Sequence, residues 1–381
     1  MSVDEWNLEA LTEIAQCPLT RESVTIASEE SIRRLNDRIG EGRARDAGGN
    51  WVQQPVEMGL VSTDGCYLYP ILQGVAVMLP SLAIILDETR TKDPVVLRPE
   101  ANEVKEFYEE FGWKKDGGGE DYVDATGWED LRPVSREYIR KCHRRLGTHF
   151  PKTGTYFLDV ASGAVQYPEY VEYSEGFSYR VCVDLSFRAL VEARKKLGHR
   201  GIFICGDISN LPLRSGVMDT AMSLHTIYHM PVDQQALAMN EIHRVLRVGQ
   251  AAVIVYSWGH HSKLMRLPNA GVRAIERIRN LPRAAGARLR RLLSPNPSVA
   301  AAGMGTIYTR YQGYDWFSSQ QWPFKYELYS WRSVSPTFLK TYVHRWSLGG
   351  QFLELLYALE SQYPRFLGQY GQYAMIQLRK S

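Results

Sequence analysis

Apolar runs alternate with helix-like segments between residues 151 and 258. Five short runs consist mainly of apolar residues: Tyr156–Val160, Tyr179–Asp184, Gly201–Asp207, Met218–Leu224 and Ala251–Tyr256. Runs of this kind are typical of strands that are buried on both faces of a parallel sheet. Between them, Ser186–Leu197 and Asp233–Leu246 have helical character, and Ser186 is a candidate N-cap. The alternation predicts an α/β fold with a doubly wound, mostly parallel sheet.

Acidic residues stand where three of these predicted strands end. Asp159 closes the first strand and is followed by the small residues of Ala161–Ala164, so that the backbone can approach a ligand closely. Asp184 closes the second strand, where an acid can accept hydrogen bonds from both ribose hydroxyls. Asp207 closes the third and can accept from an adenine amino group, with Ile208 against the ring. Together these acids predict an adenosine site, although each acid could instead cap a helix, and Asp159 could instead orient backbone amides.

The order of these segments resembles the motif series of class I S-adenosylmethionine (SAM)-dependent methyltransferases. The segments are LDVASG, VCVDLS, GDISNLPL, MDTAMSLHTIYHM and EIHRVLRVGQAAVIVY. The resemblance implies a Rossmann-like sheet of seven strands, in which the last strand, Tyr373–Arg379, runs antiparallel to the rest. It also implies SAM as cofactor and a methyltransferase of the type 11 class. The candidate cofactor-binding residues are Tyr108, Asp159, Ala161, Ser162, Gly163, Asp184, Leu185, Gly206, Asp207, Ile208 and Leu224.

The turn after the first strand departs from the family pattern. The family has three glycines in this turn, whereas here Ala161 and Val165 replace the first and third, and Gly163 remains. A non-catalytic scaffold with a SAM fold is therefore one alternative to an active enzyme.

Two histidines follow the fourth predicted strand. His225 and His229 are four residues apart, a spacing that would place them on one face of a helical turn. In the resembled family this loop faces the methyl group, so both are candidate general bases toward a hydroxyl or amine. The alternative for each is a structural histidine bonded to a backbone carbonyl.

The regions before the core suggest a lid and a ribbon. Residues 89–150 are expected to form lid helices, in which Tyr108, Trp113 and Tyr122 close over the cofactor or simply pack on the sheet. Residues 1–88 resemble a Trm112-like zinc ribbon, but only Cys17 stands at a ligand position, and Thr20, Ser62 and Gly65 occupy the others. A tetrahedral zinc site needs four nitrogen or sulfur ligands, so we expect this fold to persist without metal.

The C-terminal region contains a basic segment and an aromatic one. Residues 263–293 are strongly basic with apolar residues at helical spacing, which is compatible with a solvated cap face, with peripheral contact to an anionic membrane, or with binding of a polyanion. Tyr308–Trp331 is dense in aromatic residues, which suits a cap that recognises an acceptor as well as plain core packing. We assign residues 151–258 to the SAM-binding core, 259–335 to a cap insertion and 336–381 to the end of the methyltransferase fold.

Composition adds few constraints. Five scattered cysteines without a CxxC pair favour a reducing compartment, and the acidic start does not resemble a signal peptide, so we expect a cytoplasmic protein. A formal net charge of +3 does not by itself argue for nucleic acid. We expect O- or N-methylation of a small-molecule or glycan-like acceptor, and the alternative substrate is RNA, to which binding would depend steeply on salt.

Overall fold

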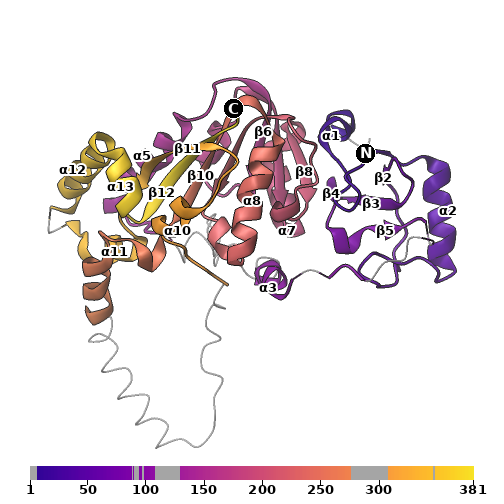
Figure 1. Ribbon diagram of the computed structural model, residues 1–381, viewed down its shortest axis with the longest axis horizontal. Coiled ribbons are helices and arrows are strands. Elements are labelled where there is room, and N and C mark those ends of the chain that lie inside the picture. Colours follow the sequence, from indigo (N-terminus) through magenta and orange to yellow (C-terminus); the bar gives the residue numbers. More distant parts are fainter. Residues whose placement is uncertain are drawn as a thin grey trace, which may run out of the picture.

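The protein is built around one long mixed sheet with helices on both faces (Figure 1). The computed structural model describes residues 7–87, 89, 94–96, 98–107, 129–275, 308–345 and 348–381. Among the described helices, none is long and apolar enough to span a bilayer.

The elements before residue 150 are mostly short. They are α1 (Leu8–Ile14), β1 (Val24–Ile26), α2 (Glu29–Gly40), β2 (Gly59–Ser62), β3 (Tyr67–Leu72), β4 (Val75–Val77), β5 (Ile84–Ile85), α3 (Pro99–Phe107) and α5 (Pro133–Gly147).

The remaining elements alternate as the hydrophobic pattern predicts. They are β6 (Gly154–Val160), α6 (Pro168–Glu172), β7 (Phe177–Asp184), α7 (Phe187–Leu197), β8 (Gly201–Cys205), β9 (Met218–Leu224), α8 (Val232–Val245), β10 (Leu246–Ser257), α10 (Tyr314–Ser319), β11 (Lys325–Arg332), α11 (Pro336–Tyr342), α12 (Gly349–Gln362), α13 (Pro364–Tyr370) and β12 (Tyr373–Arg379). Short 3-10 turns lie at Ile208–Asn210 and Ile227–His229. The predicted N-cap is confirmed, because the Ser186 hydroxyl accepts the Ala189 amide at the start of α7.

The sheet has 12 strands rather than the seven expected. The strands from β6 onward take the order β8-β7-β6-β9-β10-β12-β11, and β6 to β10 are parallel. The expected antiparallel insertion of the last strand is confirmed, since β12 runs antiparallel to both β10 and β11. β11, which lies within the expected cap segment, is therefore a strand of the sheet.

The additional strands come from the N-terminal region. β4 pairs in parallel with β8, with Ala76 opposite Ile204 and Val77 opposite Cys205. Strands β1 to β3 continue outward from β4 by antiparallel pairing, and β5 pairs with β3. Because β4 joins the edge of β8, the two regions share one hydrogen-bonded sheet.

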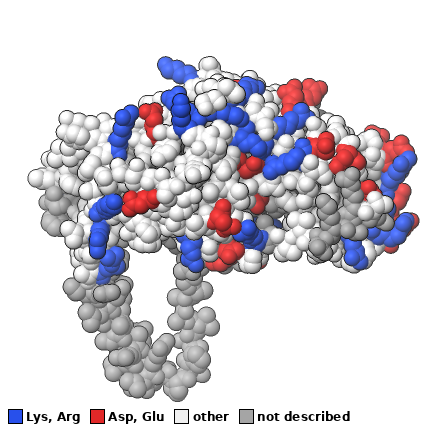
Figure 2. Space-filling view, in the orientation of Figure 1, with Lys and Arg blue, Asp and Glu red and all other residues white. Residues whose placement is uncertain are grey.

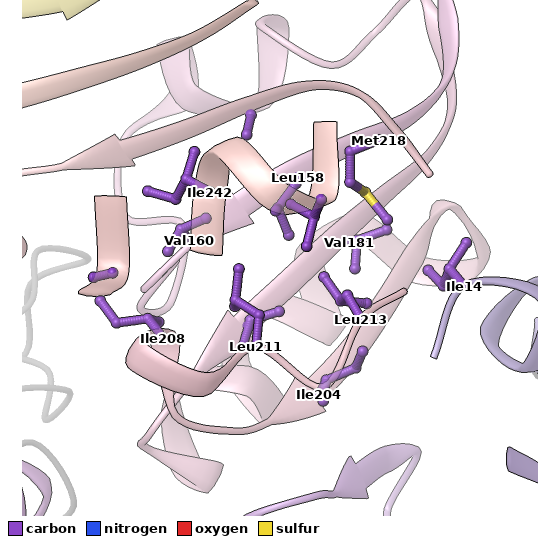
Figure 3. Packing of buried hydrophobic residues seen from close by; sticks show 14 of the residues in the cluster. Ile14, Leu158, Val160, Val181, Ile204, Ile208, Leu211, Leu213, Met218 and Ile242 are labelled. Atoms are coloured by element: carbon purple, nitrogen blue, oxygen red, sulfur yellow. The ribbon is translucent and has the colours of Figure 1, made fainter. Parts of the chain in front are cut away.

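Apolar side chains fill both faces of this sheet. Figure 3 shows Leu158, Val160 and Val181 from the strands packed with Ile242 of α8 on one face. Ile14 of the N-terminal helix α1 joins the same cluster. On the opposite face, α5, α7 and α12 bury a second apolar cluster. The helices on both faces leave the carboxyl ends of the parallel strands as the place for a ligand.

Candidate functional site

A cavity lies at the carboxyl ends of β6, β7, β8 and β9. It encloses about 1100 Å³ of empty space, part of which opens to solvent, and α3 contributes Ala101, Val104 and Lys105 to its wall. A cavity at this edge of a parallel sheet is the usual place for a ligand. Of the predicted residues, those that line the cavity are Asp159, Ala161, Ser162, Gly163, Asp184, Leu185, Asp207, Ile208, Leu224, His225 and His229.

The turn after β6 has the left-handed backbone that glycine favours. Ala161, Gly163 and Val165 have φ values of 57°, 53° and 50°. The two non-glycine residues therefore adopt the glycine conformation at a cost of about 1–2 kcal/mol each. The Lys196 ammonium donates to the carbonyls of Ala164 and Val165 at 2.9 Å each, which supports the turn from α7. The replacement of two glycines thus strains the turn without filling the cavity.

Asp184 connects this turn to the end of β7. Its Oδ2 accepts the Gly163 amide and its Oδ1 accepts the Ser186 amide, each at 2.8 Å. Asp184 therefore has a structural role in addition to its place in the cavity wall.

The two carboxylate oxygens of Asp207 differ in their hydrogen bonds. Its Oδ1 accepts the Ser209 amide at 2.8 Å and the Ser209 hydroxyl at 2.7 Å. Among the described residues, no donor is bonded to Oδ2, and Asp207 lines the cavity. This oxygen is consequently available to accept a hydrogen bond from a ligand.

Asp159 pairs with a guanidinium, and no backbone amide of the described residues donates to it. Its Oδ2 accepts from Arg180 Nη2 at 2.5 Å and from Nε at 3.1 Å, and both side chains are buried. Burial raises the pKa of the Asp159 carboxyl, and Arg180 opposes that rise. Arg180 follows from no motif in the sequence, because its partner is 21 residues away and on the neighbouring strand.

Two predicted cofactor residues are not part of the described wall. Gly206 is not among the lining residues, and its amide donates to the Asp184 carbonyl at 3.0 Å. Tyr108, Trp113 and Tyr122 lie outside the described residues. Other residues that line the cavity were not predicted, because no sequence motif marks them; among them are Lys105, Tyr170, Met222, Thr226 and Gln234.

His229 is held as a neutral base. Its Nδ1 lies 2.9 Å from the Tyr308 carbonyl oxygen, which can only accept, so Nδ1 carries the proton. Burial lowers the pKa of His229 to about 4, against the smaller opposing effect of this carbonyl. At neutral pH the Nε2 lone pair is therefore free of a proton.

His225 does not share a helical turn with His229, contrary to the expectation. It precedes the 3-10 turn Ile227–His229 and has a φ of 61°. Its ring packs edge-on against Trp331 and Tyr373, with centroid distances of 4.5 and 5.2 Å. Burial lowers the pKa of His225 well below 6.5. Both rings line the cavity from the connection between β9 and α8, His225 before the 3-10 turn and His229 at its end.

A buried polar cluster lies behind His225. Arg332 donates from Nη1 to both carboxylate oxygens of Glu129 at 2.9 Å, between the rings of Trp331 and Tyr373. Within the described part of the chain, Arg332 Nε, Trp331 Nε1 and both ring nitrogens of His143 have no hydrogen-bond partner. His143 contacts Trp331 and the cavity residue Tyr170. Unpaired buried donors are uncommon, and a ligand or water is the usual partner.

The N-terminal cysteines are buried in the described fold. Cys17 Sγ lies 3.1 Å from the Tyr69 hydroxyl and accepts the Thr20 amide at 3.3 Å. Cys66 is also buried, and its amide donates to Asp64. No group of three potential metal ligands occurs among the residues that the structure describes.

Comparison with known proteins identifies the core. Residues 158–254 match the family described as methyltransferase domain. This match confirms a methyltransferase domain in the segment predicted as the SAM-binding core, residues 151–258. No curated protein sequence matches the chain.

Solved structures resemble the chain at low identity. Phosphoethanolamine N-methyltransferase 1 from Haemonchus contortus, in complex with phosphoethanolamine and S-adenosylhomocysteine, is 10% identical over 75% of this chain and 50% of its own, with a TM-score of 0.43. Geranyl diphosphate C-methyltransferase from Streptomyces coelicolor A3(2) is 11% identical over 75% of this chain and 100% of its own, with a TM-score of 0.43.

A third structure is a complex between the Trm112 methyltransferase activator of Haloferax volcanii and a methyltransferase. It is 18% identical over 32% of this chain and 55% of its own, with a TM-score of 0.27. The present chain thus spans about half the length of this structure and of the Haemonchus contortus enzyme, at 55% and 50%.

Proposed function

We propose that this chain, whose residues 158–254 match a methyltransferase domain, transfers the methyl group of SAM to a small-molecule or glycan-like acceptor, on oxygen or nitrogen. The observation that carries the proposal is one cavity that combines strand-end carboxylates with neutral histidines. Asp184 and Asp207 line it from β7 and from the residues after β8, and His225 and His229 line it from the loop after β9.

The cavity residues fit the cofactor chemically. Asp207 Oδ2 would accept from the adenine amino group, and Asp184, which lines the cavity at the end of β7, would accept from ribose hydroxyls. Lys105 on α3 would supply a positive charge for the carboxylate of the cofactor. When bound, SAM supplies a methyl group on a sulfonium centre, a good leaving group.

The residues of the chain then need to orient the acceptor and exclude water. Most of the acceleration of methyl transfer comes from holding the acceptor in the correct orientation. His229, with its proton on Nδ1, presents Nε2 as the hydrogen-bond acceptor for a hydroxyl or amine of the substrate. Because the pKa of His229 is about 4, the imidazole is a weak base on its own. Its Nε2 therefore accepts a hydrogen bond from the substrate hydroxyl or amine and orients that group.

The polar cluster behind His225 is buried and does not line the cavity. Trp331 Nε1 and Arg332 Nε are buried donors without partners among the described residues. Glu129 balances the charge of Arg332, so the cluster does not itself demand an anion.

The cofactor site is tested by Asp207→Asn, because this change keeps an oxygen for Ser209 and replaces Oδ2 by an amide donor. We expect SAM and S-adenosylhomocysteine to bind about 10- to 100-fold more weakly in calorimetry, as for a lost hydrogen bond to a charged group. Asp87→Asn is the matched control, since Asp87 accepts from the Thr89 amide and hydroxyl in the same way, outside the cavity. Equal binding by both variants would contradict the assignment of Asp207.

The acceptor class is tested by following S-adenosylhomocysteine release with small hydroxyl and amine compounds, with sugars and with RNA. Turnover with a small molecule supports the proposal. Turnover with RNA alone would overturn it in favour of RNA methylation, and failure of the wild type to bind SAM would favour a scaffold.

For residues 1–88 we propose a degenerate Trm112-like domain. Antiparallel pairing of β1, β2, β3 and β4 supports it, and so does the position of Cys17 beside Tyr69. Stoichiometric zinc in the purified protein, lost on Cys17→Ser, would contradict a domain that folds without metal.

A further inference from the structure

The helices α12 and α13 carry an exposed apolar stripe at the end of the molecule opposite the N-terminal region (Figure 1). Its members are Leu348, Phe352, Leu355, Leu359, Tyr363 and Phe366. Phe352, Leu355 and Leu359 share one face of α12, because they are three and four residues apart. Leu348 and Tyr363 flank that helix, and Phe366 lies on α13. Leu348 and Leu355 are 67% and 60% exposed, and Tyr363 and Phe366 are each 53% exposed. We refer to these six residues as the apolar stripe.

The stripe is distinct from the face by which α12 packs on the protein. That inner face buries Leu353 and Glu360, and Glu360 pairs with Arg145 of α5 at 3.0 Å. The outer face is thus not needed to attach the helix. A helix that is apolar on both faces is normally covered on both.

Neighbouring elements extend the apolar surface. Phe338 of α11 lies 6.3 Å from Phe352, measured between ring centroids. Pro268, Phe338, Tyr342, Val343, Gly349 and Phe352 line a groove of about 810 Å³ beside the stripe. Leu264 and Leu267, which are exposed, continue it, since the Leu264 amide donates to the Tyr370 carbonyl after Phe366. Apolar patches of this extent on a protein surface mark sites of association.

The charges around the stripe are mainly positive. Residues 260–275 and 333–370 contain the exposed Lys263, Arg266, Arg273, Lys340, Arg345 and Arg365. The acidic residues of the same ranges are Glu354, which pairs with Lys141, and the buried Glu360. From outside these ranges Asp315 pairs with Lys263 and Glu327 with Arg365, so the excess of positive charge rests on Arg266, Arg273, Lys340 and Arg345. Figure 2 shows α12 and α13 largely without charged side chains, with Lys and Arg below them, toward the helical residues 266–275.

The charge distribution decides between occupants. A second copy of the chain on the same face would bring two sets of basic residues together, which is unfavourable. An anionic lipid surface complements them, and Phe, Tyr and Leu side chains are those that enter the acyl boundary of a bilayer. We propose that the apolar stripe and its basic rim dock this protein on the surface of an anionic membrane.

Vesicle flotation with the full chain tests the proposal. The probes are vesicles of phosphatidylcholine alone and of phosphatidylcholine mixed with phosphatidylserine. We expect the wild type to float with the mixed vesicles, and less so at high salt, which screens the basic rim. The double variant Leu355→Ser with Leu359→Ser should weaken binding to the vesicles at least about tenfold, because it removes two apolar side chains that the contact with the membrane would bury.

Two further variants separate the components of binding. Lys340→Glu with Arg345→Glu should abolish the preference for phosphatidylserine. Val248→Ser is the matched control, because Val248 is 74% exposed in β10 and lies outside the stripe, so its binding should equal that of the wild type. All positions are exposed, and thermal unfolding verifies that each variant folds.

Three results would overturn the proposal. The first is a wild type that stays in solution with both kinds of vesicle. The second is equal loss of binding in Val248→Ser and in the stripe variant. The third is a wild-type dimer in light scattering that becomes a monomer on Leu355→Ser with Leu359→Ser, which would make the stripe a protein interface.

Discussion

At the residue scale, the turn after β6 shows how far a binding loop tolerates substitution. Glycine reaches positive φ values without strain, and an alanine or valine does so at a cost. Ala161 and Val165 nevertheless adopt these values, while Gly163 binds Asp184 and Lys196 binds the carbonyls of the turn. The turn therefore keeps its shape because surrounding polar contacts offset the local strain.

Ala161→Gly should relieve that strain. Because glycine also has greater freedom in the unfolded chain, the net gain in the free energy of unfolding is about 0.5–1 kcal/mol, measured by urea denaturation. Ala164→Gly is the matched control in the same turn, and it should lower the free energy of unfolding by a similar amount. A loss of stability in both variants would show that Ala161 is not strained.

At the element scale, the pairing of β4 with β8 unites the two regions. A strand at the edge of a sheet exposes unpaired backbone groups, and β4 covers those of β8. The Met78 amide extends this ladder by donating to the Cys205 carbonyl at 2.8 Å. Cys205 immediately precedes Gly206 and Asp207, so the ladder also supports the segment that carries a proposed cofactor residue.

Met78→Pro removes this donor and should lower the free energy of unfolding by about 3 kcal/mol more than Met78→Ala does, because only the proline change removes the amide hydrogen. Both variants lose the same buried side chain, which makes the alanine variant the reference. Chemical denaturation gives the difference, and limited proteolysis between residues 78 and 98 should increase for the proline variant alone. Equal stability of the two variants would mean that the ladder contributes little.

At the scale of the whole molecule, buried neutral histidines make stability depend on pH. Burial lowers the pKa of His143 to about 3 and that of His229 to about 4, and the pKa of His225 is also lowered. Between these values and about 6.5 the unfolded chain binds more protons than the folded one. The free energy of unfolding should therefore decrease as the pH falls below about 6.5, and remain unaffected by these groups above it.

His143→Phe isolates one part of this effect. Each histidine contributes up to about 1.4 kcal/mol per pH unit within its window, so the variant should lose stability less steeply between pH 6 and 4. Phenylalanine keeps the ring contacts with Tyr167 and Tyr170 and removes two nitrogens that have no partner among the described residues. His199→Phe, at an exposed position, serves as the control and should keep the wild-type slope.

Much of the core could be predicted because local pattern and tertiary environment agree there. Continuous apolar runs became β6, β7, β8, β9 and β10, and the strand-end residues Asp184 and Asp207 reached one cavity. Interactions between distant residues could not be predicted. The pairs Asp159 with Arg180 and Glu129 with Arg332 depend on which strands and loops become neighbours, and His225 depends on a backbone turn that no spacing rule encodes.

The amino-acid sequence alone determined the alternation of strands and helices and the residues at the strand ends, because periodicity and capping act over a few residues. Tertiary structure decided that β4 extends the sheet, that His225 has a left-handed backbone before the turn of His229, and that α12 keeps an apolar face outward. These outcomes depend on hydrogen bonds and burial between segments far apart along the chain, and such contacts exist only once the chain has folded.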